Sequence, residues 1–520
     1  MLSAFIWIPF IVAAAIAFYP FQGKEVSYRR IALITTISLL ILNILLGFKF
    51  DPASPGMQFG EYLPWIDWLG LNYHLGIDGL SFPLLFLNSL LTVIAIYSTN
   101  ENVSRSQFYY ALLLILNGAV SGAFLAQNLL LFFLFYELEI VPLYFLIAIW
   151  GGERRGYAGM KFLLYTAVSG FLVLISFLGL VWLSGATTFA YEPLRNNTLP
   201  VDTQILLLIP LLVGLAIKIP IFPFHTWLPD AHVFPFHTWL PDAHVEASTP
   251  VSILLAGVLL KLGTYGLLRF GVGLFLEGWV VIAPWLATLA AVSALYGASC
   301  AIAQKDMKKV VAYSSIAHMA YVLLAAAAAT RLSIVSAICQ MISHGLITSM
   351  LFLLVGVVYK KTGSRDVDFL RGLLNPERGL PITGTLMILG VMASAGIPGM
   401  VGFIGEFLVF RGSFPIFPIQ TLFCMVGTGL TAVYFLLMIN RVFFGRLTPE
   451  LAKIPRSTWT ERFPGIVLAL LIILLGLQPS WMVRWSEPQV GVLLTGNKDV
   501  AMAGKPQSKT ENNISPSTTN

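Results

Sequence analysis

The chain has 520 residues, of which 57% are hydrophobic and only 11% are charged, and its mean hydropathy is +0.82. A soluble protein of this length needs more charge to cover its surface, so the composition excludes an ordinary soluble enzyme and indicates one long membrane domain. The net charge of +6 does not indicate nucleic-acid binding, because the Lys and Arg residues lie between apolar runs, where they orient membrane spans.

Apolar runs long enough to cross the hydrocarbon core as helices recur along the whole chain. The first run lacks the basic segment and the cleavage site of a signal peptide, so we expect it to be a permanent span. The apolar lengths predict an all-α, polytopic membrane protein with about fourteen transmembrane helices. We expect these helices at approximately 1–19, 30–48, 78–98, 107–126, 128–150, 160–183, 203–224, 248–270, 278–300, 309–328, 332–359, 381–411, 417–443 and 463–483.

Charge between the spans predicts their orientation. Basic residues follow the first, fifth, ninth, eleventh and thirteenth spans, such as Arg154 after the fifth. The connection after the second span holds instead Asp51, Glu61 and Asp67. By the positive-inside rule the odd-numbered connections face the cytoplasmic side, and both termini face the opposite side. The polar stretch 497–520 has no periodicity and is expected to be a disordered tail.

One segment is duplicated. The dodecapeptide FPFHTWLPDAHV occurs at 222–233 and again, without change, at 234–245. Two occurrences do not make a solenoid repeat. The second occurrence adds roughly 18 Å of helix, too much to fit inside one span. We therefore expect one copy to bulge at a membrane face or to line a cavity, and either copy could hold the native place.

Ionisable side chains also lie inside the predicted spans. An ionised group at the bilayer centre costs about 2.5–3.5 kcal/mol, and such groups usually mark ion pathways. Single residues have simpler explanations, because a lysine can extend to the membrane surface and a histidine can bond to backbone carbonyls. The whole set favours proton transport, since a bundle does not need it for stability. It comprises Glu137, Glu139, Lys218, Lys261, His318, His344 and Glu406, of which Glu139 is expected to be structural.

The chemistry of these residue types suits a proton pathway. A buried lysine holds its proton weakly, and a nearby carboxylate strengthens that hold, so a Glu–Lys pair acts as a switch. Histidines titrate near neutral pH and can relay protons between such pairs. Helix breakers lie beside two of the charges: Pro220 and Pro223 follow Lys218, and the GIPG segment at 396–399 precedes Glu406. Matched interrupted helices in two halves of a chain are typical of inverted repeats around a transport path.

The sequence predicts no redox cofactor, metal or nucleotide site on this chain. Its three cysteines, Cys300, Cys339 and Cys424, are far apart and lie in apolar stretches. No Cys/His cluster is present to bind iron–sulfur, haem or zinc, and no glycine-rich phosphate-binding loop occurs.

Six segments resemble the proton-pumping antiporter-like family of respiratory complex I. The resemblance covers about residues 60–445 and is closest to the chain 4 type of cyanobacterial and plastid NAD(P)H–quinone oxidoreductases. It rests on FFLFYELEIVPLYFLIAIWGG, KIPIFPFHTWLPDAH, EASTPVSILLAGVLLKLGTYGLLRF, KDMKKVVAYSSIAHMAYV, QMISHGLITSMLFLLVG and SAGIPGMVGFIGEFLVF. The family has the FPFHTWLPDAH segment once, so its doubling here predicts a disturbed seventh helix and weakened pumping.

The resemblance implies roles for the buried charges. An acid of the fifth span is implied to pair with a lysine of the seventh, by motif position Glu137 with Lys218. The resemblance also implies a central lysine in the eighth span, two bridging histidines and an exit glutamate, where a lysine would favour a sister subunit. These positions fall on Lys261, His318, His344 and Glu406.

The resemblance implies two inverted five-helix repeats with broken helices 7 and 12. Accordingly, the expected divisions are helices 1–3 at 1–106, the first repeat (helices 4–8) at 107–270, the second repeat (helices 9–13) at 271–445, helix 14 at 446–496, and the tail at 497–520.

The resemblance also implies a multi-subunit complex whose other membrane subunits, including sister antiporter-like subunits, are the partners of this chain. NAD(P)H or ferredoxin and plastoquinone would be used by other subunits, and this chain would bind no cofactor. The implied location is the thylakoid membrane, with both termini on the lumenal side. Two alternatives are a subunit of a multi-subunit cation/proton antiporter and a purely structural membrane subunit. Glu406 favours the chain 4 type over the antiporter, and the buried charges disfavour a structural role.

Overall fold

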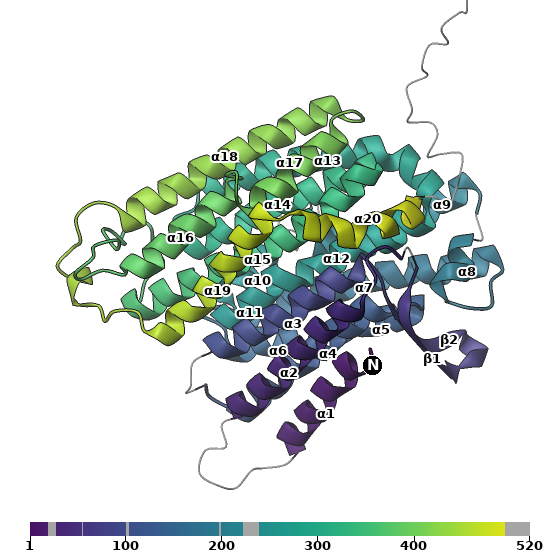
Figure 1. The fold of residues 1–520 in the computed structure, drawn as a ribbon, viewed down its shortest axis with the longest axis horizontal. Helices are drawn as coiled ribbons and strands as arrows, with labels where there is room; N and C mark the ends of the chain where they lie inside the picture. The colour runs from purple at the N-terminus through teal and green to yellow at the C-terminus, as the bar shows by residue number, and fades with distance from the viewer. Residues whose placement is uncertain (19–27, 55, 100–102, 197–198, 222–238, 495–520) are drawn as a thin grey trace, which may run out of the picture.

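The computed structural model describes the chain except for residues 19–27, 55, 100–102, 197–198, 222–238 and 495–520. Among the described residues, 12 helices are long and apolar enough to cross a membrane. Two shorter apolar helices are α1 (Ala4–Phe18) and α16 (Pro381–Ser394). Figure 1 shows most of the helices side by side in one bundle. The prediction of an all-α, polytopic fold is therefore confirmed, and the count of about fourteen spans stays a prediction.

The first half of the chain forms short and long helices, and α5 begins at a side-chain cap. The Asn128 side chain accepts hydrogen bonds from Leu130 N and Leu131 N and so begins α5. The elements are α1, α2 (Tyr28–Lys49), α3 (Ser81–Ser98), α4 (Ser106–Leu125), α5 (Leu129–Leu138), α6 (Ile140–Trp150), α7 (Arg155–Ser184), α8 (Tyr191–Asn196), α9 (Val201–Lys218) and α10 (Trp239–Glu246).

In the second half, α14 and α15 also begin at side-chain caps. Asp306 caps the first turn of α14, and Thr330 forms a capping box with Ser333 at the start of α15. The elements are α11 (Thr249–Leu254), the π-helix η2 (Leu255–Leu259), α12 (Leu260–Gly266), the π-helix η3 (Leu267–Val272), α13 (Leu276–Ile302), α14 (Met307–Ala328), α15 (Arg331–Thr362), α16, α17 (Val401–Ser413), α18 (Pro418–Phe443), the short 3₁₀-helix η4 (Leu451–Lys453), α19 (Trp459–Leu477) and α20 (Ser480–Leu494).

The helices divide into an inner and an outer group. The span Thr249–Val272 is 100% buried in its most apolar window, and α14 and α15 are each 94% buried. In contrast, α2 and α19 are 33% buried and α18 is 39% buried, so their apolar outer faces meet lipid or other subunits. The inner helices hold Lys261, His318 and His344, and these three side chains are buried inside the protein.

The innermost span is irregular. Between Thr249 and Val272 it changes from α11 to the π-helix η2, back to the short α12, and then to the π-helix η3. Lys261 lies on α12, between the two π segments. Wider π turns misalign backbone carbonyls and occur frequently at functional sites. The apolar run LLAGVLLKLGTYGLL predicts a span, but it contains no signal for these segments.

One β-hairpin adds to the helical fold. Strands β1 (Gln58–Ile66) and β2 (Leu71–Ile77) pair antiparallel, with Tyr62 opposite His74, and protrude beside the bundle (Figure 1). Gly70, with φ of +69°, closes the turn between them. This segment was expected only as an acidic connection, because apolar run length does not detect a short exposed hairpin.

A buried ion pair fastens the start of α3 to η3. Asp78 Oδ1 accepts from the backbone N–H of Ser81 at 2.9 Å, and Asp78 Oδ2 lies 2.5 Å from Arg269 Nη2. Arg269 Nε also donates to Tyr265 Oη at 3.3 Å. Both charged side chains are almost completely buried. The pair anchors one end of the span that holds Lys261, and the sequence analysis missed it because both residues fall at predicted span ends.

Candidate functional site

Glu139 and Lys218 form a fully buried ion pair. The chain interrupts its fifth span at Glu139, between α5 and α6, and α9 ends at Lys218. Lys218 Nζ lies 2.5 Å from Glu139 Oε1, and neither side chain is exposed. Among the described residues, no donor other than Lys218 reaches the Glu139 carboxylate. The charge of each residue therefore depends on the other.

The predicted pairing of Glu137 with Lys218 is wrong, because Glu139 occupies that position. Glu137 is only partly buried and points to α7, where a Cβ at Gly170 would collide with its Oε1 atom. Two residues along a helix correspond to a rotation of roughly 200°, so only one of the two acids can face α9. In the structure Glu139, at the interruption between α5 and α6, is the acid that faces α9.

Lys261 lies at the centre of the bundle and contacts His344. Its ammonium donates to Ala256 O at 2.6 Å and lies 2.7 Å from His344 Nδ1. Ala256 belongs to the π-helix η2, and the irregular helix thus supplies an acceptor for the lysine. Lys261 is 0% exposed, so it does not extend to the membrane surface.

His318 lies between His344 and Glu406. Its ring centroid lies 5.9 Å from that of His344. His318 Nδ1 lies 3.1 Å from Glu406 Oε1, and Nε2 lies 3.0 Å from Ser394 Oγ. With both ring nitrogens bound to side chains, His318 does not merely cap a backbone carbonyl. The structure therefore brings four of the six predicted site residues into one continuous row of contacts.

The break between α16 and α17 positions Ser394 and Glu406. The chain leaves the helix at Ala395 and re-enters it at Val401. Gly396 has φ of +71°, and a Cβ there would lie 3.0 Å from Glu406 Oε2, so this turn favours glycine. The predicted interruption of helix 12 is confirmed.

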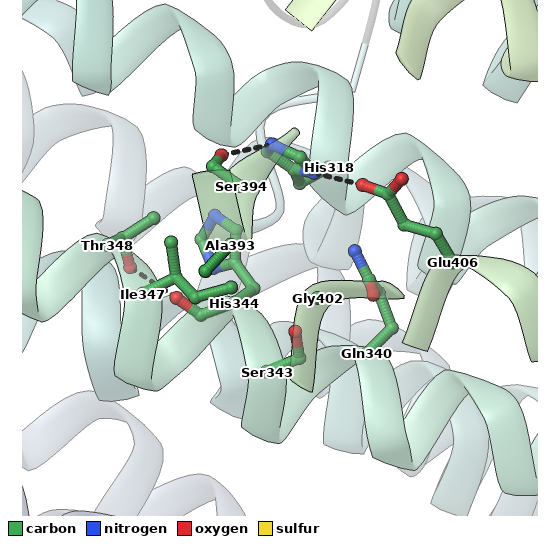
Figure 2. A pocket seen from close by; sticks show the side chains of 10 residues that line it. All are labelled: His318, Gln340, Ser343, His344, Ile347, Thr348, Ala393, Ser394, Gly402 and Glu406. Carbon is green, nitrogen blue, oxygen red and sulfur yellow. Dashed lines mark hydrogen bonds and ion pairs between the residues drawn. The ribbon is translucent and has the colours of Figure 1, made fainter. Parts of the chain in front are cut away.

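A small cavity lies between His318, His344 and Glu406 (Figure 2). It has about 10 Å³ of room for the centre of a water-sized sphere, which suits about one water molecule. Its other lining residues include Gln340 and Ser343, which the sequence analysis did not select. The polar residues Gln340, His344 and Thr348 follow each other at intervals of four along α15, a pattern that could have indicated one polar helix face.

The Glu139–Lys218 pair and the row that begins at Lys261 remain separate. Among the described residues, no hydrogen bond or ion pair joins Lys218 to Lys261. The helices that carry them are in close contact nevertheless, because a Cβ at Gly263 on α12 would lie 3.4 Å from Lys218 Cβ. In the same part of the chain, no three His, Cys, Asp or Glu side chains form a set that could hold a metal ion.

A family described as NADH:quinone oxidoreductase/Mrp antiporter, TM matches residues 126–234 and 232–431. These segments contain every residue of the site described above. The chain belongs to this family.

Similar proteins include NAD(P)H-quinone oxidoreductase chain 4 1 of Synechococcus sp. (strain JA-3-3Ab), 40% identical over 92% of this chain and 89% of that protein. NADH-quinone oxidoreductase subunit M of Rhodobacter capsulatus is 36% identical over 95% of this chain and 96% of that protein. A chain of respiratory complex I from Thermus thermophilus has a TM-score of 0.84 at 26% identity and covers 95% of this chain and 99% of its own length. A chain of the Mrp complex from Dietzia sp. has a TM-score of 0.82 at 19% identity, covers 97% of this chain and 99% of its own length, and shares the fold.

The family match divides at the duplicated dodecapeptide, since its two segments overlap at 232–234. The end of the second copy lies in α10, where His244 is fully buried and stacks on Phe352 with ring centroids 5.0 Å apart. Ala247 lies just beyond α10, and its carbonyl oxygen accepts a hydrogen bond from Lys308 Nζ at 2.6 Å. The second copy thus ends inside the packed bundle. The first copy, 222–233, and the expected bulge lie outside the described residues.

This arrangement predicts different effects of one substitution in the two copies. His244→Asp should prevent stable assembly, because an unpaired carboxylate buried against Phe352 costs several kcal/mol. His232 is the same residue of the first copy, and His232→Asp should assemble normally, because His244 already occupies the place against Phe352. Native electrophoresis of the membrane complex measures how much of it assembles with each variant. If the His244 variant assembled and the His232 variant did not, the first copy would be the one that packs in the bundle.

Proposed function

We propose that this chain is the proton-translocating, chain 4-type membrane subunit of a quinone-reducing complex. The observation that supports this most is the row of side-chain contacts from Lys261 through His344 and His318 to Glu406 in the centre of the bundle. Relatives at 36–40% identity over most of the chain are subunits of quinone oxidoreductases.

The row can pass a proton in defined steps. A proton on Lys261 Nζ moves across the 2.7 Å contact to Nδ1 of His344. The ring then releases a proton from Nε2, which has no partner among the described residues. A water molecule in the cavity that both rings line would carry this proton to His318, and the Glu406 carboxylate 3.1 Å away stabilises the resulting imidazolium. Glu406 takes the proton last.

The Glu139–Lys218 pair serves as the switch at the other end. Protonation of Glu139 neutralises the one carboxylate that the described residues place in contact with Lys218, which weakens the lysine's hold on its own proton. Glu137 remains in the proposal as a second acid beside this pair.

The proposal places electron transfer elsewhere in the complex. NAD(P)H or ferredoxin and plastoquinone are proposed to be used by other subunits, because this sequence has no cofactor-binding motif. The cyanobacterial relatives favour a thylakoid membrane, and the basic connections favour lumenal termini. The partners are the other membrane subunits, including sister subunits of the same family.

Inverted membrane vesicles that contain the complex test the proposal against the alternative of a cation/proton antiporter. Vesicles from cells that lack this chain should lose proton uptake driven by NAD(P)H or reduced ferredoxin, and restoring the chain should recover it. If donor-driven uptake stays unchanged while sodium/proton exchange without a donor disappears, the chain is an antiporter subunit and the proposal fails.

A further inference from the structure

Lys218 has a second partner besides Glu139, the aromatic face of Tyr136. Lys218 Nζ lies 3.3 Å from the centroid of the Tyr136 ring, and 3.4 Å from the Tyr136 backbone carbonyl oxygen. Tyr136 is 0% exposed. A cation over a desolvated aromatic face is attracted by the electron density of the ring, and the attraction is stronger there than at a water-exposed site.

The ring is held in this position by hydrogen bonds through its hydroxyl group. Tyr136 Oη lies 3.1 Å from Ser169 Oγ on α7, and Ser169 Oγ donates to Gly214 O on α9 at 2.6 Å. A serine hydroxyl has one hydrogen, so the Tyr136 hydroxyl must be the donor to Ser169. The tyrosine hydroxyl therefore points away from Lys218 and leaves the ring face to the lysine.

Through Tyr136 and Ser169, these contacts link Lys218 to Gly214 on the same helix, α9. Gly214 lies one turn before Lys218, and a Cβ at Gly214 would approach Ser169 O to 2.6 Å, so α7 and α9 are closely packed there. The position of the ring relative to Lys218 is thus fixed by the same helix that holds the lysine.

We propose that Tyr136 is a positioning residue whose ring face holds the ammonium form of Lys218 whether or not Glu139 is charged. This inference rests on the proposed function. Glu139 changes its charge when it accepts a proton, whereas the ring does not, so the ring supplies a constant part of the lysine's affinity for its proton. Without the ring, Lys218 would release its proton at lower pH in either state of Glu139.

Among the described residues, two acids on the α5 side act on Lys218, Glu139 and Glu137. On α7 the nearest polar group in these contacts is Ser169, which does not titrate in the working range. Changes at Tyr136 can therefore be interpreted against these two acids.

The test uses the whole complex in membranes and measures proton pumping as a function of pH. Tyr136→Phe keeps the ring face and should keep the alkaline limit of pumping within about 0.3 pH units, since only the hydroxyl contact is lost. Tyr136→Leu removes the face and should move that limit to lower pH by about one unit, because Lys218 then loses its proton more readily.

Phenylalanine with one, two or three ring fluorines at position 136 gives a second measurement if the leucine variant fails to assemble. Fluorine weakens the electron density of the face while keeping its shape, so the alkaline limit should fall stepwise with fluorine number. Equal limits in the whole series, or in the leucine and phenylalanine variants, would overturn the role of Tyr136. If the unmodified complex does not pump at all, the proposed function itself fails.

Discussion

Lys261→Met is expected to reduce proton translocation by roughly a hundredfold or more, the range in which positioned proton donors contribute to rates. Lys261 is fully buried and is the group that delivers a proton to His344 Nδ1. Methionine keeps the unbranched stem but has no exchangeable proton, so the row of contacts loses its first member. The measurement is the proton-to-electron ratio of donor-driven pumping in inverted vesicles.

A surface lysine provides the matched control for this substitution. Lys305 has a 76% exposed side chain and pairs with Asp368 at 3.0 Å. An exposed pair of this kind contributes little to stability, so Lys305→Met should leave the ratio unchanged. A normal ratio in the Lys261 variant would contradict the proposed pathway, whereas a loss in both variants would indicate a general defect of assembly.

Glu139→Gln is expected to destabilise the complex far more than Glu137→Gln. Removing one partner of a fully buried ion pair costs about 3–5 kcal/mol, because the remaining charge is left uncompensated. Of the two acids, Glu139 contacts Lys218, whereas Glu137 is only partly buried and makes no such contact. The two substitutions are chemically identical and two residues apart, so each is the control for the other. Thermal unfolding of the complex in detergent measures the difference.

A double variant separates stability from transport at this pair. Lys218→Met with Glu139→Leu removes both buried charges and should restore most of the stability, since apolar replacement of a buried pair is often neutral. Pumping should stay low because the switch is absent. Greater destabilisation by Glu137→Gln than by Glu139→Gln would show that the assigned pairing is wrong.

The sequence alone was sufficient to predict the apolar spans and to select most residues of the row of contacts. Apolar run length predicts a helical membrane bundle, and an ionisable residue inside an apolar run is costly unless it is inside the protein, so His318, His344 and Glu406 could be selected without coordinates. The break before Glu406 was also predictable, because the GIPG segment cannot continue a regular helix.

The features that the sequence did not predict depend on the rotation of side chains around their helices and on contacts between residues far apart in the sequence. Run length does not give the angle of a side chain around its helix, and Glu137 and Glu139 could not be separated until the interruption between α5 and α6 was known. The π segments beside Lys261 lie in a continuous apolar run that contains no local signal for them. The Asp78–Arg269 pair joins residues 191 positions apart.

An experimental map of the intact complex at a resolution that shows ordered water tests the central claim most directly. We expect ordered water molecules that join the Glu139–Lys218 pair to Lys261, and at least one water between His344, His318 and Glu406. Dry apolar packing between these side chains, or their displacement toward lipid, would contradict it.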